Sequence, residues 1–250
     1  MKIFYVLDNF FKNYLLNNHG EKEIAELLLP MMYIRDIPHE LISKIFARIY
    51  TQNTSFYPEM NKNLMKKHEK KFQTFIQIMF EGLRSGSLSS STDEYLYRGI
   101  KMARKEIDEI MKIYERWNQK QDKNSLPCFL LNSRTFLSFS KIENKILRFL
   151  GSTDNKYYGV VFKLRNDVNI DDKYATNADL ENISRYPAEK EVLFFPQTTF
   201  CLKNITKDNY NGRKDIIIIT LDYLGKYEKV FNDFKKDDDF QNEFIDNFQP

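Results

Sequence analysis

From residue 127 onward the sequence repeats short apolar segments, and this pattern limits the fold more than any other feature. Each segment has four to eight residues and is rich in β-branched or aromatic side chains, which favours buried strands. The predicted strands are Cys128–Leu131, Thr135–Ser140, Tyr157–Leu164, Glu191–Phe195, Thr198–Leu202 and Asp215–Leu221. One helix among them is predicted from four apolar residues in helical phase, Ile142, Ile146, Phe149 and Leu150.

The first half of the chain is predicted to be mainly helical. Apolar residues between Phe72 and Leu83 recur at intervals of three and four, so they form one stripe on a helix. A serine-rich loop follows over 84–93, then a short aromatic strand over Glu94–Ile100 and a second amphipathic helix. Helices followed by mostly antiparallel strands predict an α+β fold. The 250 residues are divided into a helical extension (1–38), a main domain (39–224) and a charged helix or tail (225–250).

Composition argues against several classes of protein. The 38 basic and 35 acidic residues nearly balance, and the densest basic run, Lys66–Phe72, is interpreted as a solvated helix face, so no nucleic-acid partner is expected. No segment reaches the ~18 apolar residues of a membrane span, and no signal-peptide cleavage site is recognised. The three scattered histidines argue against a metal site. Cys128 and Cys201 lack CxxC spacing and are expected to be unpaired core residues in a reducing compartment.

The tripeptide Glu-Lys-Glu occurs twice, in two different contexts. After Glu21–Glu23 the apolar residues follow a helical period, so these carboxylates would stabilise a first helical turn. The second copy, Glu189–Glu191, runs into a short apolar segment that ends at Pro196 and is predicted to be a buried strand. Alternate residues of a strand point to one face, so both carboxylates would enter one site if the strand begins by Glu189. Carboxylates beside a buried strand cost free energy, which favours a functional role.

Two further polar features lie on predicted strands. Arg98 precedes Gly99 in the only Arg-Gly pair of the chain. Arginine offers a planar fork of donors for phosphate oxygens, and glycine lets a ligand approach the backbone. Ser138 and Ser140 close their strand, where their hydroxyls could orient a carboxylate. Taken singly, each of these residues is more often structural than functional.

In chain order, the segments "YLYRG", "FLSFS" and "SRYPAEKEVLFF" resemble the Arg–Ser–Glu signature of the ADP-ribosyltransferases. The similarity is to the branch of clostridial toxins and vertebrate ecto-enzymes, and Tyr50–Met65 resembles the upstream aromatic-Thr, Tyr and Asn-x-x-Leu segment of that branch. It spans roughly residues 40–224 and implies a mostly antiparallel core of two sheets around an NAD cleft. Phe139 replaces the usual Thr between the two serines, which alters the packing of the site floor without removing either hydroxyl.

The resemblance implies roles in breaking the nicotinamide–ribose bond of NAD. Arg98 would hold the phosphate and ribose region of NAD, and Gly99 would bind the nicotinamide carboxamide through its backbone. Ser138 would orient Glu191, the catalytic glutamate. The bond breaks through an oxocarbenium-like state, which an anionic Glu191 would stabilise. NAD is then a substrate, and no metal is required.

The resemblance also implies how the acceptor is chosen. Glu189 matches the position that carries Glu in arginine modifiers, and Tyr186 lies in the target-recognition turn. The expected activity is mono-ADP-ribosylation of arginine in an unidentified acceptor protein, by a cytoplasmic enzyme or an effector delivered into another cell. The alternatives are an NAD glycohydrolase that uses water, a degenerate NAD-binding module without turnover, and a helical scaffold beside an unrelated β domain.

Overall fold

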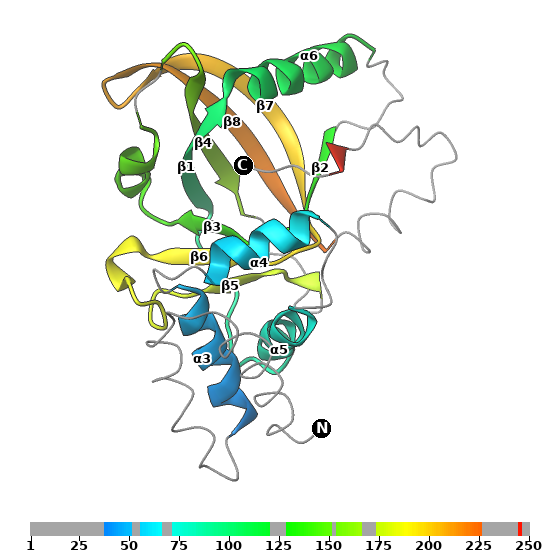
Figure 1. Ribbon diagram of the computed structural model, residues 1–250, viewed down its shortest axis with the longest axis vertical. Coiled ribbons are helices and arrows are strands. Elements are labelled where there is room, and N and C mark those ends of the chain that lie inside the picture. Colours follow the sequence, from blue (N-terminus) through cyan, green and yellow to red (C-terminus); the bar gives the residue numbers. More distant parts are fainter. Residues whose placement is uncertain are drawn as a thin grey trace.

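The computed structural model describes residues 38–51, 56–66, 72–120, 129–151, 154–166, 174–226 and 245–246. The predicted helical extension over 1–38 lies outside these residues apart from Pro38, and most of the predicted tail over 225–250 lies outside them too. Helices and one large sheet make up the described part, which confirms the α+β class (Figure 1). No described helix is long and apolar enough to cross a membrane.

The helices lie in two places relative to the sheet. Helices α3 (His39–Tyr50), α4 (Phe56–Met65) and α5 (Gln73–Arg84) precede it; α3 and α5 lie in the lower part of Figure 1, and α4 lies nearer its middle. The helix predicted between Phe72 and Leu83 is thereby confirmed as α5. Helix α6 (Arg104–Lys120) follows the first strand and lies at the opposite end.

The described strands form one hydrogen-bonded sheet in the order β5-β6-β3-β1-β4-β8-β7-β2-β9. Only the β4–β8 and β2–β9 pairs are parallel, so the predicted antiparallel character is confirmed. The two predicted sheets are joined into one, because Tyr97 of β1 pairs with Ser140 of β3. The bounds are β1 (Tyr95–Ala103), β2 (Phe129–Ser133), β3 (Leu137–Ser140), β4 (Tyr157–Arg165), β5 (Asn177–Asp179), β6 (Glu191–Phe194), β7 (Thr198–Tyr210), β8 (Arg213–Lys226) and β9 (Ile245–Asp246).

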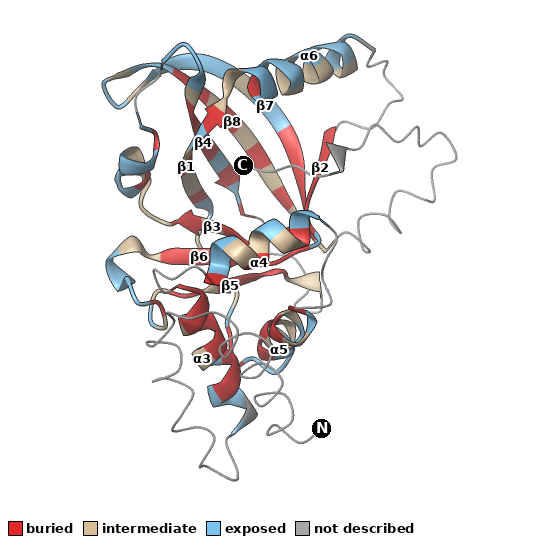
Figure 2. Cartoon of the chain, in the orientation of Figure 1, coloured by how far each residue is buried: buried red, intermediate tan, exposed pale blue. Residues whose placement is uncertain are grey.

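Two apolar cores lie on opposite faces of β6. The helical core is formed by α3, α4 and α5 against one face, and Phe75 is at its centre, with ring centroids 5.3 Å from Phe46 and 5.0 Å from Phe56. The sheet core lies on the other face and continues under α6. Consecutive residues of a strand face opposite sides, so Leu193 of β6 enters the helical core and Phe194 enters the sheet core. The buried residues accordingly line both faces of β6 (Figure 2).

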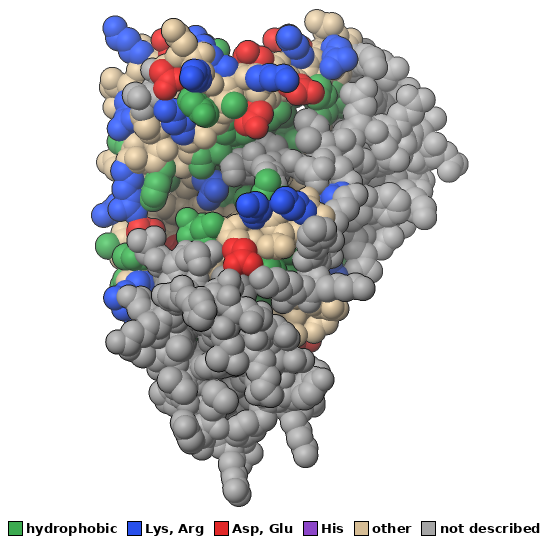
Figure 3. Space-filling model, viewed as in Figure 1, with side chains coloured by type: hydrophobic (Ala, Val, Ile, Leu, Met, Phe, Trp, Pro, Cys, Tyr) green, Lys and Arg blue, Asp and Glu red, His purple; other side chains and the backbone are tan. Residues whose placement is uncertain are grey.

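Several elements differ from the sequence prediction. Strands β7 and β8 extend far beyond the apolar segments and form a long hairpin, and β5 was not predicted. The helix predicted over 142–150 is a 3-10 helix, η3 (Glu143–Phe149), in which Ile146 is buried but Phe149 is half exposed. Charged side chains of both signs are interspersed on the described surface in view (Figure 3).

The prediction for the cysteines is wrong in one respect. Cys201 is buried, as expected, but it is disulfide-bonded. Strand β7, which carries Cys201, pairs with β2, and β2 begins one residue after Cys128, the only other cysteine. Spacing along the sequence could not reveal this proximity, because it arises from strand pairing. Disulfides persist mainly in oxidising compartments, so the argument for a reducing compartment no longer holds.

Candidate active site

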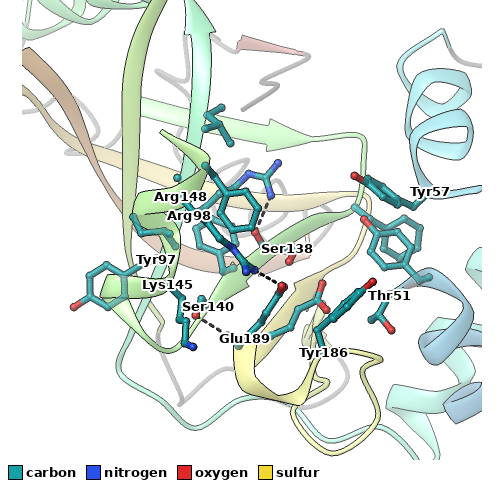
Figure 4. A pocket seen from close by; sticks show the side chains of 18 of the residues that line it. Thr51, Tyr57, Tyr97, Arg98, Ser138, Ser140, Lys145, Arg148, Tyr186 and Glu189 are labelled. Carbon is teal, nitrogen blue, oxygen red and sulfur yellow. Dashed lines mark hydrogen bonds and ion pairs between the residues drawn. The ribbon is translucent and has the colours of Figure 1, made fainter. Parts of the chain in front are cut away.

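A cavity of about 660 Å³ lies where β1 meets β3, between the helical end and the rest of the sheet. Its walls come from α3, α4, β1, β3, η3 and the turn before β6 (Figure 4). Every candidate site residue from the sequence lines this one cavity. These residues are Arg98, Gly99, Ser138, Ser140, Tyr186, Glu189 and Glu191.

Glu191 is a buried carboxylate at the start of β6, with 7 % of its surface exposed. Burial raises its pKa above the usual value, and the nearby charge of Glu189 raises it further. Hydrogen bonds from Ser138 and Ser184 and the charge of Arg98 act in the opposite direction. Ser138 thus lowers the pKa of Glu191, and its role in orienting this carboxylate stays a prediction.

Arg98 lies within β1 and connects it to β3. Its Nη1 atom donates a hydrogen bond of 2.8 Å to the carbonyl oxygen of Ser138. Burial lowers the pKa of Arg98, while the negative charge of Glu191 raises it. The guanidinium therefore brings a positive charge to the part of the cavity that also holds the buried carboxylate.

Gly99 allows η3 to pack directly on β1. A Cβ atom at this position would lie 2.5 Å from the carbonyl oxygen of Ile146, a backbone atom that cannot turn aside. This close approach brings Lys145, Arg148 and Phe149 of η3 to the cavity wall. The contact between Gly99 and a nicotinamide carboxamide remains a prediction.

The expectation that Glu189 and Glu191 share a strand face is wrong. Glu189 ends a short 3-10 helix, η5 (Pro187–Glu189), and β6 begins only at Glu191. Pro187 fits the first position of such a turn, and Lys190 adopts a left-handed conformation with φ 47°, which redirects the chain. Both carboxylates nevertheless line the cavity. Glu189 reaches it from the turn, and Glu191 reaches it from the first position of β6.

Ser140 holds this turn and contacts no carboxylate in the structure. Its hydroxyl donates a hydrogen bond of 2.7 Å to the backbone oxygen of Glu189. The next residue, Lys141, donates its backbone N–H to the carbonyl oxygen of Lys190 at 3.1 Å. The end of β3 therefore fixes the backbone from which Glu189 extends.

The carboxylate of Glu189 forms an ion pair with the guanidinium of Arg148 across the cavity (Figure 4). The Arg148 side chain is 53 % exposed and that of Glu189 is 30 % exposed. The guanidinium also lies over the ring of Phe149, 4.5 Å from its centroid. Arg148 thus already pairs with Glu189, the carboxylate that was predicted to recognise an arginine acceptor.

The upstream segment Tyr50–Met65 supports the cavity from the helical side. Tyr50, Thr51, Tyr57 and Asn61 all line it. Asn61 makes two hydrogen bonds to the backbone of Phe136, at 3.2 and 3.3 Å, and so attaches α4 to the segment that leads into β3. The segment that resembled the upstream family motif is therefore part of the same site.

Three residues that hold the turn before β6 were not predicted. Arg48 of α3 donates to the carbonyl oxygen of Ile183 at 3.1 Å, and Thr51 accepts the backbone N–H of Arg185 at 2.9 Å. Ser184 accepts the backbone N–H of Tyr186 at 3.0 Å and donates to Oε2 of Glu191 at 3.4 Å. Thr51 lies in the upstream segment Tyr50–Met65 and Ser184 opens the segment "SRYPAEKEVLFF", but no role was assigned to either from the sequence, because their partners lie in other elements; Arg48 lies in no recognised motif.

No three or more His, Cys, Asp or Glu side chains within the described residues are arranged to hold a metal ion. No model of a protein family matches the chain, and no curated protein matches it either. The fold is instead similar to that of solved structures whose sequences differ widely from this one.

The similar structures are ADP-ribosyltransferases of bacteria. HopU1 of Pseudomonas syringae has a TM-score of 0.54 at 12% identity, with 88% of this chain and 97% of HopU1 covered. Plx2a, a toxin of Paenibacillus larvae, has a TM-score of 0.50 at 18% identity, with 86% and 97% covered. Vis, from Vibrio splendidus, has a TM-score of 0.50 at 15% identity, with 86% and 90% covered. The chain therefore has the fold of the ADP-ribosyltransferases, as the resemblance implied.

Proposed function

We propose that this protein transfers ADP-ribose from NAD to the side chain of an arginine in another protein and releases nicotinamide. The observation that carries the proposal is one cavity in which a buried carboxylate, a partly buried guanidinium and a second, more accessible carboxylate converge. These groups are Glu191, Arg98 and Glu189. The shared fold of HopU1, Plx2a and Vis supports the same function.

The cavity suits a dinucleotide in size and charge. Its volume of about 660 Å³ falls within the usual range of ligand pockets. Arg98, Lys101 and Lys145 line it and offer positive charge to a diphosphate, and a guanidinium can bind phosphate oxygens with two donors. Apolar and aromatic side chains complete the walls, which gives the nicotinamide and ribose rings surfaces to pack against.

Glu191 would stabilise the positive charge that develops on the ribose. As the bond to nicotinamide breaks, its electron pair leaves with the ring, and C1′ becomes cationic. An ionised carboxylate in a water-poor site stabilises such a charge strongly. Ser138 and Ser184 hold the carboxylate from two elements and favour its ionised form. Activity would therefore need Glu191 deprotonated.

Glu189 would serve the acceptor. A guanidinium carries no free lone pair while it is protonated, so a carboxylate must orient it and take up a proton as it attacks. The ion pair between Glu189 and Arg148 supports this role, because it is a carboxylate–guanidinium contact within the cavity. The proposal of arginine as the acceptor rests on this pair.

One reaction with NAD and agmatine tests the proposal. Total nicotinamide measures bond cleavage, and ADP-ribosyl-agmatine measures transfer to a guanidinium. Glu191→Gln should lose both by about 10²–10³-fold, the usual effect of removing one well-placed electrostatic group. Glu189→Gln should keep hydrolysis of NAD and lose most of the transfer, since an amide cannot accept the proton. An equal loss of both activities in Glu189→Gln would place this residue in bond cleavage instead.

The second candidate function is an NAD glycohydrolase. The observation in its favour is that Arg148 already pairs with Glu189. An arginine acceptor would have to displace Arg148 from this carboxylate, whereas water could react without displacing it. Nicotinamide release without any ADP-ribosyl-agmatine would establish this alternative. Binding of NAD without nicotinamide release would indicate a binding module instead.

The biological setting remains part of the proposal. Plx2a is a toxin with the same fold, which supports a toxin or an effector delivered into another cell. The acceptor would then be a protein of the target cell. Mass spectrometry of ADP-ribosylated proteins after incubation with NAD and a cell extract would identify it.

A further inference from the structure

We propose that Arg148 is itself an acceptor, so that the protein ADP-ribosylates its own η3 helix. This inference rests on the proposed function, because the same NAD cleavage must supply the ADP-ribose. The basis is the position of one guanidinium, which lies against Glu189 in the cavity that also contains Glu191.

The backbone that carries Arg148 is held firmly in place. η3 packs on Gly99 through the backbone of Ile146, and Tyr210 of the β7–β8 hairpin donates its hydroxyl to Glu143 at 2.5 Å. The side chain of Arg148 is less restricted, with 53 % of its surface exposed. A fixed backbone with a half-exposed side chain keeps the guanidinium beside the cavity, where a ribose bound in the cavity could meet it.

Geometry of this kind favours a reaction within one molecule. A group held next to its reaction partner can act as if it were present at ~10⁵ M or more. Glu189 would orient the guanidinium in the way proposed for an external acceptor. Arg148 therefore meets the requirements for an acceptor without any binding step of its own.

The chemical step is balanced without any further reactant. A guanidinium nitrogen of Arg148 forms a bond to C1′ of the ribose as the bond from C1′ to nicotinamide breaks. The electron pair of that bond leaves with nicotinamide, which departs as a neutral molecule. The proton lost by the guanidinium passes to the carboxylate of Glu189 and then to water.

Two other ion pairs of the chain show why the cavity matters. Arg165 pairs with Asp222 at 2.8 Å, and Arg84 pairs with Glu81 at 3.0 Å. Their arginine side chains are 58 % and 59 % exposed, close to the value for Arg148, but neither arginine lines the cavity. A surface ion pair contributes little by itself, so location alone distinguishes Arg148 from these two.

Modification of Arg148 would change the site. The added ADP-ribose brings two negative phosphate groups to the cavity and attaches them to the guanidinium that pairs with Glu189. The volume and the negative charge of the attached ADP-ribose would then oppose the entry of a second NAD molecule into the cavity. Self-modification would therefore limit the number of turnovers that each molecule completes.

The test is incubation of the full chain with NAD, followed by intact-mass measurement and peptide mapping. The expected result is a single added ADP-ribose on Arg148, which Arg148→Lys abolishes and the matched control Arg165→Lys leaves intact. The rate per molecule should not depend on protein concentration. Inactive Glu191→Gln chains mixed with wild type should stay unmodified, because the reaction occurs within one molecule.

Three outcomes would overturn the inference in distinguishable ways. If transfer to agmatine proceeds while Arg148 stays unmodified, the inference fails and the proposed function stands. If the label appears on other arginines, or on the Glu191→Gln chains, the modification is an ordinary intermolecular reaction. If no nicotinamide is released from NAD, both the proposed function and this inference are wrong.

Discussion

At the scale of single residues, the site depends on a carboxylate whose ionised form is opposed by its surroundings. Glu191 is buried, and Glu189 places a second negative charge nearby, so its pKa is raised. Two hydroxyls and one guanidinium only partly offset this effect. The ionised state that the proposed chemistry needs is thus maintained at a cost in folding free energy.

Replacing Glu191 by Gln should therefore stabilise the protein. The folded-state pKa lies above the unfolded value of ~4.3, so stability falls as the pH rises from the unfolded value through the folded-state pKa, and the penalty is complete above the latter. Below the unfolded value both states are protonated, and this penalty is absent. Glu191→Gln should raise the Tm at neutral pH, and the gain should disappear as the pH falls toward about 4. Thermal unfolding across this pH range measures it, and a lower Tm at neutral pH would contradict it.

Replacing Ser184 by Ala should weaken the proposed bond cleavage. A hydrogen bond to a charged group contributes ~1.5–3 kcal/mol, and a 3.4 Å bond belongs near the lower limit, so we expect about tenfold slower nicotinamide release. The pKa of Glu191 should rise further, because the remaining groups that favour its ionised form are Ser138 and Arg98. The acid limb of the pH–rate profile should then move to higher pH.

A second buried serine provides the control for Ser184. Ser133 is fully buried, and its hydroxyl donates to the carbonyl oxygen of Thr135, outside the cavity. Ser133→Ala should lower stability without moving the pH–rate profile. If both variants leave the profile unchanged, Ser184 has a structural role only.

At the scale of elements, the sequence predicts strands well where apolar side chains are dense. β4, β6 and β8 follow such segments, and each contains several buried residues. β5 has only three residues, Asn177–Asp179, and exists because it pairs with β6. The conformation of the turn before β6 also depends on distant partners. The sequence therefore predicted that Glu189 belongs to the site, but it predicted a strand where the structure has a 3-10 turn.

The packing of η3 on β1 predicts a strong effect of Gly99→Ala. The new Cβ would lie 2.5 Å from a backbone oxygen, so η3 must move away from the cavity. We expect a higher KM for NAD and a lower Tm. Gly159→Ala on the neighbouring strand is the control, because its closest contact is the flexible end of Ile216 at 2.8 Å. Nicotinamide-release kinetics that match wild type in Gly99→Ala would mean that η3 does not shape the NAD site.

At the scale of the whole molecule, two cores share β6, one of the strands that carry the site. β6 sends consecutive side chains into the helical core and the sheet core, β3 contributes Leu137 and Phe139 to the sheet core, and Glu191 and Ser138 lie on these same strands. Neither core can unfold without exposing apolar side chains on one face of β6. The described part of the chain should therefore unfold as one cooperative unit.

Phe75→Ala tests this cooperativity. Phe75 is fully buried in the helical core, and its truncation should cost ~3–5 kcal/mol. The only tryptophan, Trp117, packs against Phe129 at the sheet core, with ring centroids 5.8 Å apart. Its fluorescence transition should shift to lower temperature together with the far-UV circular dichroism transition. A fluorescence transition that stays at the wild-type temperature would mean that the cores unfold separately.

The hydrogen bonds from α3 to the turn before β6 also govern when the cavity can form during synthesis. Arg48 and Ile183 are 135 residues apart, and Thr51 and Arg185 are 134 apart. A ribosome that adds ~5–20 residues per second needs about 7–27 s to cover that interval. During this time Arg48 and Thr51 lack their hydrogen-bond partners in the turn before β6. A nascent chain therefore gains its cavity only after the segment containing Ile183–Glu191 has left the ribosome.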